Sequence, residues 1–150
     1  MNEIIVNENE IRRDKIFDFL QVEGFRPEKV DENSVKLRFE GKTVWVDIDL
    51  EDETYYQVIA ANIWSIESPE ELTRAYIAAS KATRSYKVSK AFVKQDETNI
   101  WVAADQFESD VQNLLPKLIR LIQIVNNQAK TFAEIMHELE LKSSPVTSLQ

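Results

Sequence analysis

The sequence contains no cysteine, only two glycines and only four prolines. The absence of cysteine excludes disulfides, zinc–thiolate sites and a thiol nucleophile, and it is compatible with a reducing compartment. The low glycine and proline content excludes a collagen-like or low-complexity chain. No apolar run reaches the roughly 20 residues that a transmembrane helix needs, and the start, M-N-E-I-I-V-N-E-N-E, is unlike a signal peptide. We therefore expect a cytoplasmic protein without a membrane span.

Positive charge is also scarce, because 18 lysines and arginines stand against 26 aspartates and glutamates, for a net charge of -8. Such a charge repels phosphate backbones and anionic lipids, so we expect neither nucleic acid nor a membrane as partner. The length of 150 residues with 43% apolar residues suits one hydrophobic core. We predict a single domain over 1–142 and a flexible C-terminal tail over 143–150.

The hydropathy pattern predicts eight elements along the chain. Their order is helix 8–23, strands 35–39, 44–50 and 55–66, a helix that starts at Ser68-Pro69, strands 86–94 and 98–104, and a helix over 107–140. Glu40-Gly41 suits a hairpin turn between the first two strands, and Pro116 either kinks the last helix or starts a new segment. The order α-β-β-β-α-β-β-α predicts an α+β fold, with an antiparallel sheet and segregated helices.

The second half of the chain resembles a known family. The block from K-A-T-R-S-Y-K-V-S-K-A-F-V through T-N-I-W-V-A-A-D-Q-F to the apolar terminal helix, together with the element order, resembles the YbjN family. The fold of that family is similar to that of type III secretion chaperones. The resemblance implies a small, acidic, usually dimeric bacterial module that holds other polypeptides or acts as a regulator, with no chemistry of its own. It transfers no site residue to this chain.

The stretch N-L-L-P-K-L-I-R-L-I-Q-I-V, residues 113–125, is apolar around most of the circumference of a helix. At about 100° per residue, one broad arc faces the sheet and consists of Leu114, Leu115, Leu118, Ile122 and Val125. Leu121 lies at the edge of this arc, and Ile124 projects between Lys117 and Arg120. Because soluble proteins rarely expose large apolar patches, we predict that Leu121 and Ile124 meet a second copy or a polypeptide client. The alternative is that the first helix covers this flank inside the monomer.

Three tryptophans, Trp45, Trp64 and Trp101, fall in predicted strands. Trp45 shares the phase of Asp47, on the presumed outer face of its strand, and Trp101 is out of phase with the apolar residues beside it. If Trp45 and Trp101 share an outer face, they are candidates for gripping an extended or helical client segment. The alternative is that the second or third helix covers them. A sheet with helices on one face only would favour the binding interpretation.

Acidic residues are the one candidate for a catalytic or metal site. Asp47, Asp49 and Glu51 fall on one face of a predicted strand, where three carboxylates can hold Mg²⁺ or Ca²⁺. The alternative, which we favour, is that they form the solvent side of the hairpin and discourage edge pairing. The single histidine, His137, has no marked Ser or Asp partner. We therefore predict no catalytic residue, no bound metal and no cofactor.

Two function classes follow from these residues. The first is a non-enzymatic, chaperone-like or regulatory module that forms a homodimer and binds a polypeptide client through apolar sheet and helix surface, with Leu121, Ile124, Trp45 and Trp101 as candidate surface residues. The second is a metal-dependent hydrolase or small-ligand binder that uses Asp47, Asp49 and Glu51. A shallow apolar surface favours the first class, and acids that converge in a deep pocket favour the second.

Overall fold

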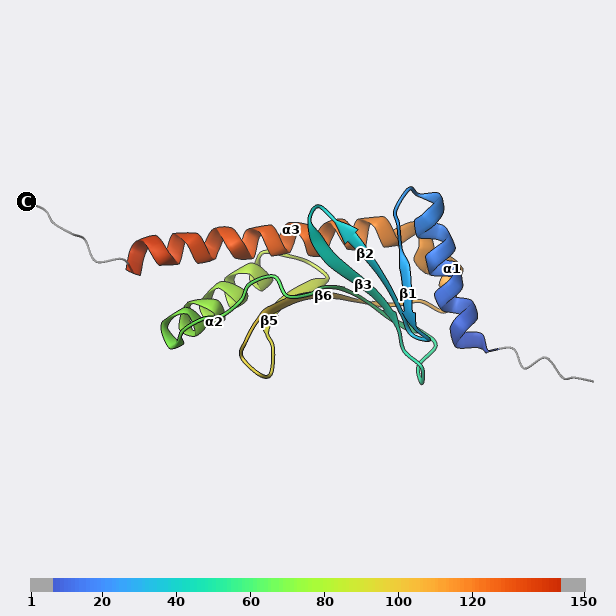
Figure 1. Ribbon diagram of the computed structural model, residues 1–150, viewed down its shortest axis with the longest axis horizontal. Helices are drawn as coiled ribbons and strands as arrows, with labels where there is room; N and C mark the ends of the chain where they lie inside the picture. The colour runs from blue at the N-terminus through green and yellow to red at the C-terminus, as the bar shows by residue number, and fades with distance from the viewer. Residues whose placement is uncertain (1–6, 144–150) are drawn as a thin grey trace, which may run out of the picture.

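The computed structural model describes residues 7–143 and shows an α+β fold (Figure 1). The elements follow in the order α1 (Glu8–Val22), β1 (Glu28–Asp31), β2 (Ser34–Phe39), β3 (Lys42–Ile48), β4 (Tyr55–Ala60), α2 (Pro69–Arg84), β5 (Ser89–Val93), β6 (Ile100–Phe107) and α3 (Val111–Ser143). The predicted fold class is thus confirmed, with one more strand than expected. The predicted tail lies outside the described residues except for Ser143, which ends α3.

Strand β1 was missed because its four residues, E-K-V-D, are all exposed and show no alternation between apolar and polar positions. The six strands form one antiparallel sheet in the order β1-β2-β3-β4-β6-β5, and α2 connects β4 to β5. The predicted turn between β2 and β3 is present: Glu40 and Gly41 have φ of 47° and 80°. Positive φ at both central residues is the geometry of a two-residue type I′ hairpin, which matches the twist of the strands.

All three helices contribute to one hydrophobic core on one face of the sheet. Alternate residues of the strands point into this core, for example Val44, Val46 and Ile48 of β3 and Val58 and Ala60 of β4. Helix α3 runs along the whole molecule, with α1 crossing near its first half and α2 lying beside its second half (Figure 1). The helices are therefore segregated to one side of the sheet, as predicted.

The start of α2 agrees with the sequence, whereas the helix predicted from 107 begins at Val111, because β6 continues to Phe107. The side chain of Ser68 accepts a hydrogen bond from the amide of Glu71 at 3.1 Å, and Pro69 occupies the first position of α2. A serine cap followed by proline satisfies one free amide and removes another at a helix start. Pro116 lies inside α3, which continues as one helix to Ser143. No new segment starts there.

The prediction for the flank of α3 needs a correction at Leu121. Leu121 is only 5% exposed and belongs to the core, whereas Ile124 is half-buried. Helix α3 contacts α1 and α2 as well as β4, β5 and β6, so its buried arc is wider than that of a helix packed on a sheet alone. Leu121 is therefore covered inside the monomer and is not a free surface for a partner.

Candidate functional site

The face of the sheet opposite the helices carries a second apolar cluster. It is formed by five strand residues and by Ala61, which directly follows β4. Its members are Trp45, Ile59, Ala61, Phe92, Trp101 and Ala103, and we call it the uncovered-face cluster. Trp45 lies directly opposite Ile59, and Ile59 lies opposite Ala103 on the other side of β4. Phe92 lies opposite Trp101. The structure thus places Trp45 and Trp101 on one outer face, and within residues 7–143 no helix contributes a residue to its apolar cluster.

Trp64 does not lie on this face, which corrects the prediction of a strand over 55–66. Strand β4 ends at Ala60, and Asn62 has a φ of 54°, a left-handed conformation that Asn tolerates and that interrupts a strand. Trp64 then turns to the helices: its ring lies 6.1 Å from that of Phe132, and its indole N–H donates to Glu71 at 3.0 Å. The indole N–H of Trp101 donates to Asn62 Oδ1 at 3.2 Å.

Three lysines lie over aromatic rings of the uncovered face. The ammonium-to-centroid distances are 5.6 Å for Lys36 over Trp45, 5.1 Å for Lys94 over Trp101 and 5.9 Å for Lys90 over Phe92. Each lysine also has a carboxylate partner, with Lys36 3.6 Å from Glu28, Lys94 3.7 Å from Asp96 and Lys90 3.1 Å from Asp105. Ring contacts of this kind are attractive because the π face is negative. The charges of the three lysines are therefore balanced within the chain.

Asp105 is the best-bonded acid on this face. Its Oδ1 accepts hydrogen bonds from the hydroxyl of Tyr55 at 2.6 Å and from the amide of Gln57 at 2.8 Å, and its Oδ2 meets Lys90. Burial by itself raises the pKa of the Asp105 carboxyl, but the three donors together outweigh this and lower it. Burial, followed by the bond to Asp105, raises the pKa of Tyr55. The pair is a structural anchor between β4 and β6.

The structure does not bring the three predicted acids together. Asp47 points to the uncovered face, where it lines a hollow with Trp45 and Trp101. Asp49 instead accepts the amides of Glu51 and Asp52, at 2.8 and 2.9 Å, and so stabilises the turn after β3. Glu51 is exposed. Within residues 7–143, no group of three or more Asp, Glu, His or Cys side chains is arranged to hold a metal ion.

The free edge of β5 is occupied by a side chain of α2. The hydroxyl of Thr83 accepts from the amide of Ala91 at 2.9 Å and donates to its carbonyl oxygen at 3.1 Å. Ala91 is the central residue of β5. Its outward backbone groups, which an added strand would use, are therefore already hydrogen-bonded.

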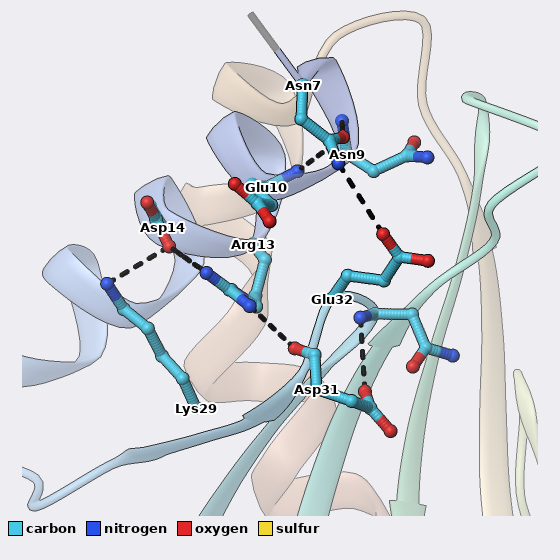
Figure 2. Close-up of polar contacts among 9 residues, drawn as sticks. Asn7, Asn9, Glu10, Arg13, Asp14, Lys29, Asp31 and Glu32 are labelled. Carbon is cyan, nitrogen blue, oxygen red and sulfur yellow. Dashed lines mark hydrogen bonds and ion pairs between the residues drawn. The ribbon is translucent and has the colours of Figure 1, made fainter.

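The opposite edge, β1, is protected by charge and by α1 (Figure 2). Arg13 donates to the carbonyl oxygen of Asp31 at 2.7 Å, and Lys29 pairs with Asp14 at 3.0 Å. The pairing of β1 with β2 is also irregular between Lys29 and Asp31. Short, charged and bulged edges resist pairing with another strand. A partner that added a strand at either edge would have to displace these contacts, whereas a partner on the uncovered-face cluster would not.

His137 is exposed, and its ring lies 5.3 Å from that of Trp64 on the helix side. His137 therefore lies on the opposite side of the sheet from the uncovered-face cluster. Among the described residues, no helix combines the length and apolar character needed to cross a membrane.

No protein-family model and no curated protein matches the chain significantly. Among solved structures, an uncharacterized protein from Methanothermobacter thermautotrophicus matches with a TM-score of 0.54 and 14% identity, over 89% of this chain and 99% of that chain. YbjN from E. coli, a candidate transcription regulator, matches with a TM-score of 0.48 and 17% identity, over 87% of this chain and 92% of that chain. These likenesses concern the fold alone, and the second is to a protein of the family that the sequence resembles.

Proposed function

We propose that this chain is a non-enzymatic protein-binding module that receives a segment of a polypeptide client on the uncovered-face cluster, in a chaperone-like or regulatory role. The observation that supports this most is that two tryptophans and a phenylalanine gather on a sheet face whose apolar cluster contains no helical residue. Apolar side chains that gather on one uncovered face mark interaction sites. Aromatic side chains also provide a large contact area with few rotatable bonds to immobilise.

The edges of the sheet support recognition by the face rather than by strand addition. Thr83 satisfies the free edge at Ala91, and Arg13 holds β1 at Asp31. A client that added a strand would have to displace these contacts. A client that lies across the face needs only to bury side chains against Trp45 and Trp101, so side chains, and not backbone hydrogen bonds, would set its affinity.

A metal-dependent hydrolase or small-ligand binder has less support. Asp49 is committed to the turn after β3, and Glu51 lies exposed on that turn. The hollow beside Asp47 is lined mainly by apolar side chains, and neither Asp49 nor Glu51 belongs to its lining. Deep pockets with converging polar groups are typical of small-molecule sites.

The homodimer predicted from the sequence stays a prediction. Leu121 lies in the monomer core, so a dimer would need another surface. The uncovered-face cluster is also the apolar surface that a second copy would bury. We assign it to a client, and the oligomeric state measured below distinguishes the two occupants.

The proposal can be tested with an array of short peptides tiled from unfolded proteins and probed with the purified chain. We compare wild type with Trp45→Ser/Trp101→Ser and with a control, Tyr76→Ser/Ile77→Ser, which removes exposed apolar side chains of α2. We expect wild type and control to bind the same peptides and the tryptophan variant, shown to be folded by circular dichroism, to lose them.

The outcome against the proposal is also defined. If wild type binds no peptide, or if the tryptophan variant retains the same peptides, the client surface lies elsewhere or does not exist. Sedimentation velocity on the same samples addresses the second copy. A wild-type dimer that becomes a monomer in the tryptophan variant, without any peptide binding, would assign the uncovered-face cluster to self-association.

A further inference from the structure

The uncovered face of the sheet contains a hollow where β3, β4 and β6 lie side by side. Its volume is about 290 Å³, and it is lined by Ser34, Trp45, Asp47, Ile59, Ala61, Asn62 and Trp101. Trp45 and Trp101 come from the strands on either side of β4, and Ile59 of β4 and Ala61, which directly follows it, belong to the same cluster. The volume is at the lower end of the range for ligand sites, about 300 Å³. It suits one long side chain rather than a cofactor.

Asp47 is the charged residue of this hollow, and one of its oxygens lacks a partner. Oδ1 of Asp47 is buried and, among the described residues, has no hydrogen-bond partner. Burial raises the pKa of this carboxyl, the nearby Ser34 hydroxyl opposes the rise, and the charge of Asp31 adds to it. A buried acceptor without a donor is unfavourable. The free protein therefore holds, beside the hollow, a carboxylate with one oxygen that lacks a donor.

The side chains around Asp47 that could donate are engaged elsewhere. Gln57 lies directly opposite Asp47 on β4, but its amide donates to Asp105. Lys36, on β2, pairs with Glu28. Arg38, further along β2, donates to Thr43 and to the carbonyl oxygen of Gly41. Among the described residues, Asp47 thus forms no ion pair with a lysine or arginine, and the Ser34 hydroxyl is the neighbouring group that favours its charged form.

The walls of the hollow suit a cation. A lysine ammonium or an arginine guanidinium is attracted to indole faces and makes strong, charge-assisted hydrogen bonds to a carboxylate. The chain already uses its aromatic rings in this way, since Lys36 and Lys94 lie over Trp45 and Trp101. An acidic side chain in the hollow would instead face the carboxylate of Asp47 at short range.

We propose that this hollow binds a lysine or arginine side chain of the polypeptide on the uncovered face, with Asp47 as counter-charge and Trp45 and Trp101 as walls. The inference rests on the proposed function and adds the chemistry of the client: an apolar segment with a basic residue among its contacts. Asp47 supplies selectivity, and the apolar cluster around it supplies most of the contact area.

The test uses the full chain labelled with ¹⁵N and three short apolar peptides that differ only in their central residue: arginine, its neutral isostere citrulline, or glutamate. The indole N–H signals of Trp45 and Trp101 report on the hollow, and that of Trp64, bonded to Glu71 on the helix side, is an internal control. We expect the arginine peptide to shift Trp45 and Trp101 and to bind about tenfold more tightly than the citrulline peptide.

Two variants make the test specific to Asp47. Asp47→Asn, of nearly the same shape, should abolish the preference for arginine over citrulline. Asp105→Asn removes the same charge from the same face, where the carboxylate already has three donors, and should keep the preference. Dispersed indole signals confirm that each variant is folded.

The peptide results distinguish a failure of the cation subsite from a failure of the proposed client surface. Equal shifts of Trp45 and Trp101 by the arginine and citrulline peptides would overturn the cation subsite and leave the binding surface in place. Preference for the glutamate peptide, or a preference for arginine that survives in Asp47→Asn, would likewise overturn it. If none of the three peptides shifts either signal, both the subsite and the proposed client surface are wrong.

Discussion

The hydroxyl of Thr83 makes two hydrogen bonds to the backbone of one residue, Ala91, donating to its carbonyl oxygen at 3.1 Å and accepting from its amide at 2.9 Å. A helix side chain thereby takes the place that a neighbouring strand would occupy at the edge of the sheet. The contact explains how the sheet can present an apolar face and still avoid pairing through its edge.

Replacing Thr83 by valine, which keeps the shape and removes the hydroxyl, should lower the free energy of unfolding by about 1–3 kcal/mol, because Ala91 loses both partners. It should also promote self-association through β5. Urea denaturation and light scattering measure the two effects. Thr73→Val is the matched control, since its hydroxyl bonds only the carbonyl of Pro69 in an exposed helix turn. Equal stability of the two variants would contradict this role.

Truncation of Leu121 should affect stability and not oligomeric state. Leu121 belongs to the core, so Leu121→Ala should lower the free energy of unfolding by about 2–5 kcal/mol. Ile124→Ala, at a half-buried position, should lower it by roughly 1 kcal/mol. Urea denaturation with sedimentation velocity tests both. A stable Leu121→Ala variant that changes from dimer to monomer would place Leu121 at an interface instead.

Neutralising Asp47 should stabilise the free protein. Burial raises the pKa of Asp47 in the folded state above its value in the unfolded chain, which is about 4. The ionised carboxylate therefore destabilises the fold fully when the pH is above the folded-state pKa, and this effect disappears when the pH falls below the unfolded-state pKa. Asp47→Asn should therefore raise the free energy of unfolding by about 1 kcal/mol at neutral pH. The gain should shrink on acidification. Denaturation curves across this pH range provide the check, and a variant less stable than wild type at neutral pH would argue against an unbalanced carboxylate.

Neutralising Asp105 should have the opposite effect and destabilise the free protein. The pKa of Asp105 is lower in the folded state than in the unfolded chain, where it is about 4. The ionised carboxylate therefore stabilises the fold at pH values above the unfolded-state pKa, and this stabilisation is lost as the pH falls through the folded-state pKa. Because the carboxyl is partly exposed, we expect Asp105→Asn to lower the free energy of unfolding by only about 1 kcal/mol at neutral pH. Wild type and variant should converge in acid. A difference that does not change with pH would show that packing, and not charge, is responsible.

Much of the fold could be predicted from local signals. Ser68 and Pro69 predict the start of α2, and Glu40-Gly41 predicts the β2–β3 turn, because caps and tight turns depend on a few neighbouring residues. Strand β1 could not be predicted, since it is exposed throughout and carries no periodic pattern. Its pairing with β2 and its contacts with α1 hold it in place.

The candidate site was predicted in part. The alternation along β3 and β6 predicted that Trp45 and Trp101 each point away from the apolar side of their own strand, because successive side chains of a strand point to opposite sides. The strand pairing in the structure then places both on one face of the sheet. The same pattern placed Trp64 on a strand, although the left-handed conformation of Asn62 ends that strand and sends Trp64 to the helices. The unbalanced charge of Asp47 was not visible in the sequence, since it depends on where Gln57 and Lys36 direct their donors.

The sequence by itself determined the α+β class, the starts of α1 and α2, the hairpin turn and the apolar side of each long strand, because each depends on residues close together in the chain. Only the tertiary structure decided that Leu121 is buried, that Thr83 closes one edge of the sheet and that the helices all lie on the face opposite Trp45 and Trp101. Burial and hydrogen bonding between distant segments depend on how the elements pack together. The composition of a single segment does not contain that information.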